Sequence, residues 1–221
     1  MFRLKITKGD ASPSLLPNFN DDIASLENEH GKLIIGLGYK ARSGKDAAAD
    51  YLVRRYGFRR IAFADHLKSV VGLAFGFDTH QMYGADKLVV DPRWGNTPVH
   101  FLQQVGTDLF RKYVDEDFWA KAVLNIIHAS DHDRWVITDT RFPNEAELIH
   151  SNGGYVFEIN RAVRPDAGRD TNHPSETSMD GYDGWDAIIY NNKGLTDLYD
   201  NVIDACQYLA RQYQTYGKPE R

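Results

Sequence analysis

The stretch Lys32-Leu-Ile-Ile-Gly-Leu-Gly-Tyr-Lys-Ala-Arg-Ser-Gly-Lys-Asp46 decides the fold class of this 221-residue chain. Its apolar beginning, which ends in glycine, predicts a buried parallel strand at residues 32–36. After the glycine-containing turn, apolar side chains recur at helical spacing, which predicts a helix over residues 45–56. A strand, a turn and a helix in this order are the setting that a phosphate-binding loop requires.

The turn itself is expected to bind phosphate through its backbone. N–H groups in such a turn point at an anion, and the dipole of the following helix adds to the attraction. Lys45 would reach the β- and γ-phosphates of a nucleoside triphosphate, and Gly44 would let the backbone approach closely. A lysine in the first helical turn is otherwise unfavourable, so a bound anion explains it better than a plain glycine turn does. The predicted donor-binding residues are Ala41, Arg42, Ser43, Gly44, Lys45 and Asp46.

The loop departs from the pattern G-x-x-x-x-G-K-[ST] in two places. Tyr39 stands where the first glycine is expected, and Gly38 comes one residue early. Asp46 takes the place of the hydroxyl residue that usually ligates magnesium. Asp46 could itself help to hold magnesium, which would offset its repulsion from phosphate. Alternatively, it only supplies favourable negative charge at a helix N-terminus, and both readings stay open.

Strands alternate with helices along the rest of the chain. Further strands are predicted at 60–64, 135–138, 155–159 and 187–190, and helices at 65–75, 98–113, 118–128, 145–150 and 195–213. Asp65 is the expected N-cap of the helix that starts there, and residues 78–98 are expected to form a long loop. The alternation predicts a three-layer α/β fold, in which helices cover both faces of a parallel sheet of about five strands.

The length suits one α/β domain with insertions, which we place at residues 32–213. Residues 1–31 are read as an irregular extension of unknown role, with one short strand at 2–6. Residues 160–185 form a long polar connection, and such segments often serve as functional lids. Residues 214–221 are read as a C-terminal tail.

Composition narrows the function classes. The formal net charge is −5, and this lack of basic excess argues against a protein that binds nucleic acid. Cys206 is the only cysteine, so no internal disulfide can form, which suits a reducing cytoplasm. The first residues lack the apolar run of a signal peptide, and no stretch approaches the ~20 apolar residues of a membrane span. We therefore expect a cytoplasmic protein without a membrane partner.

Several segments resemble, in order, the phage-type deoxynucleoside monophosphate kinases, a branch of the P-loop nucleoside monophosphate kinases. The matching segments, within residues 32–205, are Ala41–Asp46, Phe63–Lys68, Leu102–Asp108 with Phe118-Trp119, Val136–Glu145, His173–Glu176 and Asn191–Leu195. The resemblance implies the three-layer kinase fold with a lid at about 160–185. It also implies ATP as donor, magnesium as cofactor, a deoxynucleoside monophosphate as acceptor and a role in supplying DNA precursors. A phage-encoded chain would work in the host cytoplasm.

Two residues after the third predicted strand are candidate site residues. Asp139 ends that strand, where ligands bind in doubly wound sheets, and its carboxylate could hold magnesium. The alternative is a helix N-cap or an ion pair with Arg141. The matched motif favours a site role, in which the planar guanidinium of Arg141 forks onto the acceptor phosphate. The resemblance adds Lys68 and Gln103 as acceptor contacts, although Lys68 could equally be a solvated lysine.

The polar segment after the fourth predicted strand carries three arginines. In kinases of this shape, lid arginines stabilise charge on the transferring phosphoryl group. The resemblance favours Arg161 and Arg164 for this role over Arg169, while a solvated loop is the plain alternative. His100 stands where the family often has arginine, which leaves the base preference open. The oligomeric state is also open, with a homodimer as one option.

The expected reaction needs little covalent chemistry from the protein. The second pKa of the acceptor phosphate is about 6, so it is ionised at neutral pH and needs no general base. Catalysis would consist of positioning and charge neutralisation. The rivals are a P-loop kinase for another small metabolite and a nucleotide switch or ATPase that acts on a protein partner. A switch needs no acceptor pocket, whereas arginines at three places beyond the loop favour a kinase.

Overall fold

A computed structural model describes residues 4–6, 19–162 and 174–217 of the chain. The strands are β1 (Leu4–Ile6), β2 (Leu33–Gly38), β3 (Arg59–Ile61), β4 (Arg134–Thr140), β5 (Tyr155–Asn160) and β6 (Ala187–Tyr190). The helices are α1 (Phe19–Ala24), α2 (Lys45–Tyr56), α3 (Phe63–Phe75), α4 (Thr79–Tyr83), α5 (Pro98–Gln103), α6 (Phe118–Ala129), α7 (Pro143–Ser151), α8 (Pro174–Thr177) and α9 (Leu195–Tyr216). A 3₁₀ turn (Ala85–Leu88) and a π-helical segment (Gln104–Arg111) complete the described elements.

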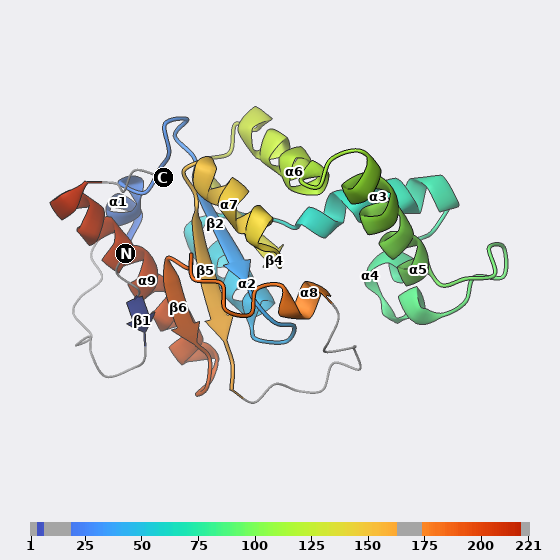
Figure 1. Ribbon diagram of the computed structural model, residues 1–221. Coiled ribbons are helices and arrows are strands. Elements are labelled where there is room, and N and C mark those ends of the chain that lie inside the picture. Colours follow the sequence, from blue (N-terminus) through green and yellow to red (C-terminus); the bar gives the residue numbers. More distant parts are fainter. Residues whose placement is uncertain (1–3, 7–18, 163–173, 218–221) are drawn as a thin grey trace. The chain divides into compact units, whose positions relative to one another are not determined.

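The strands form a parallel sheet in the order β1-β6-β5-β2-β4-β3 (Figure 1). Every residue of β2, between β5 and β4, is buried, as expected for a strand covered on both faces. The predicted parallel α/β sheet is confirmed, with one strand more than expected among the described residues. The additional strand is β1, the short strand predicted within the N-terminal extension, which joins the sheet by pairing with β6 at one edge. Because β2 and β4 are parallel neighbours, the segments that follow them start at the same edge of the sheet.

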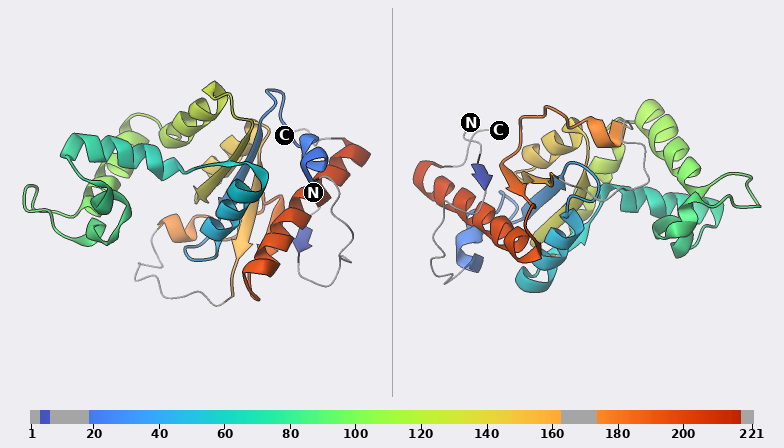
Figure 2. Two further views of the ribbon diagram at one scale, coloured as in Figure 1. Left: turned by 180° about the vertical axis from the view of Figure 1, so that it is seen from behind. Right: turned by 90° about the horizontal axis from the view of Figure 1, so that it is seen from below.

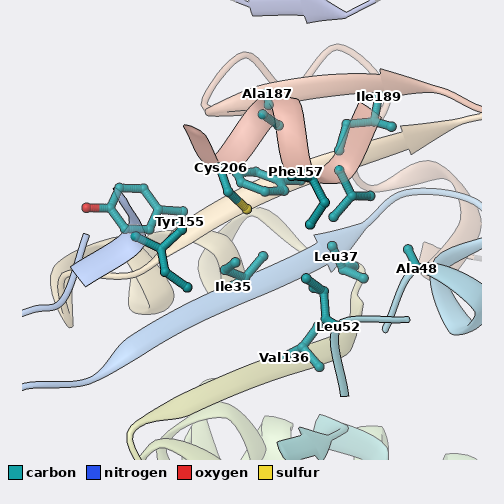
Figure 3. Packing of buried hydrophobic residues seen from close by; sticks show 14 of the residues in the cluster. Ile35, Leu37, Ala48, Leu52, Val136, Tyr155, Phe157, Ala187, Ile189 and Cys206 are labelled. Atoms are coloured by element: carbon teal, nitrogen blue, oxygen red, sulfur yellow. The ribbon is translucent and has the colours of Figure 1, made fainter. Parts of the chain in front are cut away.

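One face of the sheet packs against α1, α2 and α9. Leu33, Ile35 and Leu37 alternate along β2 and join side chains of these helices in one buried cluster. Figure 3 shows part of it, where Cys206 of α9 lies beside Phe157 of β5. Seen from behind, α2 and α9 lie in front of the sheet (Figure 2, left). Alternate side chains of the strand therefore pack against the layer of helices on this side of the sheet.

The opposite face is covered by α7 (Figure 1). Its residue Ile149 approaches β2 so closely that a Cβ at Gly36 would lie 2.6 Å from Ile149 Cδ1. Glycine at position 36 therefore sets the spacing between this helix and the central strand. With helices on both faces, the three layers predicted from the sequence are present.

The N-terminal extension was expected to be irregular apart from one strand, and it also contains α1. Phe19 and Ile23 of this short helix are buried, and the rings of Phe19 and Tyr56 pack at a tilt of 46° with their centroids 4.1 Å apart. The side-chain amide of Gln207 on α9 donates a hydrogen bond of 2.9 Å to Asp22. Tertiary packing on α9, rather than local helix preference, stabilises these six residues.

The chain divides into two compact units, and each is described by itself. The first comprises Met1–Ile61 with Ile127–Arg221 and holds the sheet, and the second comprises Ala62–Ile126. A small core of Val71, Phe77 and Met82 fills the second unit, with Phe75 and Phe101 packed against it. The predicted loop at residues 78–98 is partly helical, because it contains α4 and the 3₁₀ turn.

Two local predictions in the second unit were wrong. The helix expected to be capped by Asp65 starts earlier, at Phe63, and the Asp65 carboxylate accepts a 3.0 Å hydrogen bond from the Ala62 N–H. Asp65 therefore caps the helix from inside its first turn. The helix expected over 98–113 widens into the π-helical segment after Gln103, a deviation that apolar periodicity does not reveal. None of the helices in the described part of the chain has the length and apolar character that crossing a bilayer demands.

Candidate active site

The loop between β2 and α2 has an unusual backbone. Tyr39, Arg42 and Gly44 have φ values of 85°, 56° and 112°, in the region that favours glycine. At Gly44 a side chain is also excluded by space, because a Cβ would collide with the side-chain amide of Asn191. That buried amide donates a 2.8 Å hydrogen bond to the Ser43 carbonyl. The loop after β6 therefore helps to hold the predicted phosphate loop in shape.

Tyr39, the departure from the glycine pattern, adopts the left-handed backbone that glycine would adopt readily. This conformation costs a non-glycine residue about 1 kcal/mol or more. The Tyr39 side chain is held on both sides: its hydroxyl bonds Asp180 Oδ1 at 3.0 Å, and its ring meets Trp185 edge-on with centroids 6.4 Å apart. These contacts offset the backbone cost, so the loop keeps its turn without the first glycine.

Lys45 is buried at the start of α2. Its ammonium donates to the carbonyls of Tyr39 at 3.1 Å and Lys40 at 2.6 Å, and it lies 3.4 Å from Ser43 Oγ. Burial, followed by the positive charge of Arg141, lowers the pKa of Lys45 to about 8, against the opposing pull of nearby carboxylates. A bound anion would stabilise the charged form of this buried ammonium, as expected for a lysine that binds phosphate.

Arg141 follows β4 and is fixed at both its backbone and its side chain. Its N–H donates 2.8 Å to Glu145 Oε2, which also accepts from the Phe142 N–H at 3.2 Å. Its guanidinium Nη1 lies 2.7 Å from Glu176 Oε1. The other oxygen of Glu176 accepts a 2.9 Å hydrogen bond from the Ala41 N–H of the phosphate loop. Arg141, one of the predicted acceptor contacts, thus shares a charged cluster with the predicted phosphate loop.

Glu176 is a buried carboxylate whose charge is stabilised by this cluster. Burial works to raise its pKa, but the hydrogen bonds from Ala41 and Arg141 and the charges of Arg141 and Lys45 outweigh it, and the pKa lies below its usual range. In the sequence, Glu176 belongs to a segment that resembles the family, but the sequence alone indicates no chemical role for it. Its partner Ala41 is 135 residues away in the chain, so only the fold reveals the contact.

The two proposed magnesium ligands lie near Lys45 but in different settings. Asp46 is exposed and pairs with Arg60 of β3, which also contacts Asp50 at 3.4 Å. Asp139 lies near the end of β4, and its charge acts to raise the pKa of Lys45. The described residues hold no cluster of three metal-ligating side chains. The roles of Asp46 and Asp139 as magnesium ligands stay predictions.

Lys68 and Gln103, the other predicted acceptor contacts, belong to the second unit. Lys68 lies over the ring of Tyr83, with its ammonium 4.2 Å from the ring centroid and 3.7 Å from Asp65. It lines an open pocket of about 390 Å³ formed by α3, α4 and the turn between them. Gln103 is the last residue of α5. Their role in acceptor binding stays a prediction.

The predicted lid is described only in part. Arg161 is exposed just after β5, where the neighbouring Ala162 N–H donates 2.9 Å to Asn192. Arg164 and Arg169 lie outside the described residues. The later part of the segment contains α8 and contacts the phosphate loop through Glu176 and Asp180. The catalytic role of Arg161 and Arg164 stays a prediction.

The chain has a parallel sheet, a loop with a left-handed glycine after the strand β2, and a buried lysine at the start of the next helix. These features together define a P-loop nucleotide-binding protein. The sequence model of the family described as deoxynucleotide monophosphate kinase matches residues 96–202. A protein from Acanthamoeba polyphaga mimivirus that carries the same name is 36% identical over 188 residues, which cover 77% of this chain and 94% of that protein. The chain belongs to the deoxynucleotide monophosphate kinase family, as the resemblance predicted, and is a kinase.

Two further similarities were found. The deoxynucleoside-5'-monophosphate kinase of Escherichia phage T5 is 32% identical over 116 residues, which cover 50% of this chain and 46% of that protein. Among solved structures, dephospho-CoA kinase from Campylobacter jejuni aligns with a TM-score of 0.44 and 13% identity, over 82% of this chain and 99% of that one.

Proposed function

We propose that this chain transfers the γ-phosphoryl group of ATP to the phosphate of a deoxynucleoside 5'-monophosphate, forming ADP and the deoxynucleoside diphosphate. The observation that carries the proposal is the link between the phosphate loop and Arg141 through Glu176. This link supports the proposal because the loop would suit a donor triphosphate and the guanidinium would suit a second phosphate. The names of the relatives, together with the match to the family, supply the class of acceptor.

In the proposed reaction an oxygen of the acceptor phosphate attacks the γ-phosphorus, and the bond to the β,γ-bridging oxygen breaks. The acceptor is already ionised at neutral pH, its second pKa being about 6, so no side chain has to remove a proton. Lys45 would neutralise charge on the donor phosphates, and Arg141 would hold the acceptor phosphate. Arg161 and Arg164 are proposed to stabilise the transferring group, and Lys68 and Gln103 to contact the acceptor.

Magnesium is the proposed cofactor, held from the protein side by Asp46 and Asp139. When bound, it would supply the positive charge that neutralises charge developing on the donor phosphates. The second carboxylate of α2, Asp50, shares Arg60 with Asp46 but lies one helical turn further along. Consumption of ATP would place the reaction in a cytoplasm, that of the host if the chain is phage-encoded. A homodimer stays a prediction for sedimentation measurements.

The proposal is tested by incubating the purified chain with magnesium-ATP and each deoxynucleoside monophosphate in turn, and by measuring ADP. We expect ADP to form only when a monophosphate is present, in amounts equal to the diphosphate produced. ADP formation with ATP alone, unchanged by any monophosphate, would instead identify an ATPase or switch. A set of non-nucleotide phosphate acceptors distinguishes a kinase for another metabolite. Ribonucleoside monophosphates tested in parallel measure the sugar preference.

A further inference from the structure

Glu176 joins three segments that are far apart in the chain. It lies on α8, in the segment before β6. One of its carboxylate oxygens accepts a 2.9 Å hydrogen bond from the Ala41 N–H in the loop after β2, and the other accepts a 2.7 Å hydrogen bond from the Arg141 guanidinium after β4. The Glu176 side chain is only 8% exposed, so both contacts are shielded from water. Hydrogen bonds to an ionised group in such surroundings are stronger and more directional than those at the surface.

The contact does more than attach its segment to the loop, because a second carboxylate already does that. Asp180 accepts from the Tyr39 hydroxyl at 3.0 Å and pairs with Lys40 at 2.9 Å. Trp185 also packs so closely on Gly38 that a Cβ there would lie 2.6 Å from its ring. What distinguishes Glu176 from Asp180 among these contacts is its bond to Arg141.

We propose that Glu176 is a positioning residue, which fixes the guanidinium of Arg141 relative to the phosphate loop and so sets the spacing between donor and acceptor phosphates. The inference rests on the proposed function. Transfer needs the reacting atoms about 3–3.5 Å apart and in line, and a misplacement of ~1 Å can cost ~100-fold in rate. A guanidinium carries five N–H donors, so it can bond a carboxylate and a phosphate at once.

The first test compares Glu176→Gln with Asp180→Asn. Glutamine keeps the shape, but its amide nitrogen cannot accept a hydrogen bond, so one of the two contacts is lost in either orientation. We expect kcat of Glu176→Gln to fall roughly 10- to 100-fold, while the KM values for ATP and for the monophosphate change by less than about threefold. Asp180→Asn leaves the link to Arg141 intact and keeps an oxygen that can accept from the Tyr39 hydroxyl, so it should lower kcat much less than Glu176→Gln does.

The second test asks whether Glu176 acts through Arg141. In an Arg141→Lys background, Glu176→Gln should lower kcat by less than about threefold, because the geometry it maintains is already lost. Thermal unfolding of each variant checks folding. If Glu176→Gln does not fold, Glu176→Asp serves in its place, since its carboxylate is one methylene too short to reach both partners and kcat should again fall more than in Asp180→Asn.

Three results would overturn the inference while the proposed function stands. They are losses that multiply in the double variant, an equal loss of kcat in Asp180→Asn, and tighter ATP binding by Glu176→Gln with unchanged kcat. The last result would show that Glu176 competes with the donor phosphates for the loop. A folded wild-type chain that phosphorylates no deoxynucleoside monophosphate would overturn the proposed function and the inference together.

Discussion

The phosphate loop and the turn after β4 follow neighbouring parallel strands, yet they are built in different ways. The loop bends its backbone through positive φ at Tyr39, Arg42 and Gly44. The turn after β4 leaves the strand through Phe142, whose φ of −129° is ordinary extended backbone, and it carries its charge on Arg141. A donor site made of backbone groups tolerates side-chain changes such as Tyr39, whereas the proposed acceptor site depends on one guanidinium and its supports.

The largest expected effect concerns the proposed donor site. Lys45→Met should lower turnover at least about 100-fold, the scale of losing one preorganised charge contact in the transition state. The fold should persist, because the substitution removes a charge from a buried site without adding bulk. Turnover and circular dichroism are measured on the same preparation. Near-normal turnover in the folded variant would contradict the assignment of the phosphate loop.

The acceptor side is tested by Arg141→Lys. Lysine cannot reproduce the two parallel hydrogen bonds of a guanidinium to phosphate, and a charge-assisted bond is worth about 1.5–3 kcal/mol. We expect the KM for the monophosphate to rise roughly tenfold or more, while ATP affinity, measured by calorimetry, stays nearly constant. Weaker ATP binding with intact monophosphate binding would move Arg141 to the donor site. No change in either would make Arg141 purely structural.

The pKa of Lys45 gives a way to sharpen the comparison without mutation. Its lowered value of about 8 means that the free enzyme carries this charge below about pH 8 and loses it above. The ratio kcat/KM for ATP, which reports the free enzyme, should therefore fall by about tenfold one pH unit above that value. Bound triphosphate favours the charged form, so ATP binding near pH 8.5 should take up protons, measured by calorimetry in buffers of different ionisation enthalpy. Proton-neutral binding there would contradict the assignment.

The smallest expected effect concerns magnesium. If Asp46 helps to hold the ion, Asp46→Asn should raise the magnesium concentration for half-maximal rate by about two- to fivefold, the scale of an exposed charge contact. Asp46→Ser should partly restore it, since a hydroxyl is the usual ligand at this position. Asp50→Asn is the matched control, because Asp50 shares the Arg60 partner. An unchanged magnesium dependence in both Asp46 variants would favour the helix-dipole role.

Sequence predicted well where local pattern and fold agree. The helix at residues 45–56 has the predicted bounds, because apolar spacing and a glycine on each side define it. The strand-end rule marked Asp139 and the matched motif added Arg141, which the structure links to the phosphate loop through Glu176, while the roles of both residues stay predictions. The helix α1 was missed, since its six residues carry only two buried side chains and depend on packing against α9. A glutamate in a polar segment looks solvated in sequence, so the contacts of Glu176 needed the structure.

The buried thiol of Cys206 has a practical consequence. Burial raises its pKa to about 12, and it lies in the core cluster under α9 (Figure 3). Thiol reagents attack the thiolate, which is scarce here and shielded from the reagent. The rate at which a thiol reagent labels the wild-type chain therefore reports how often α9 separates from the sheet. Because Cys206 is the only cysteine, no other thiol contributes to the labelling rate. For the same reason, a dye attached to an engineered surface cysteine would mark a single site.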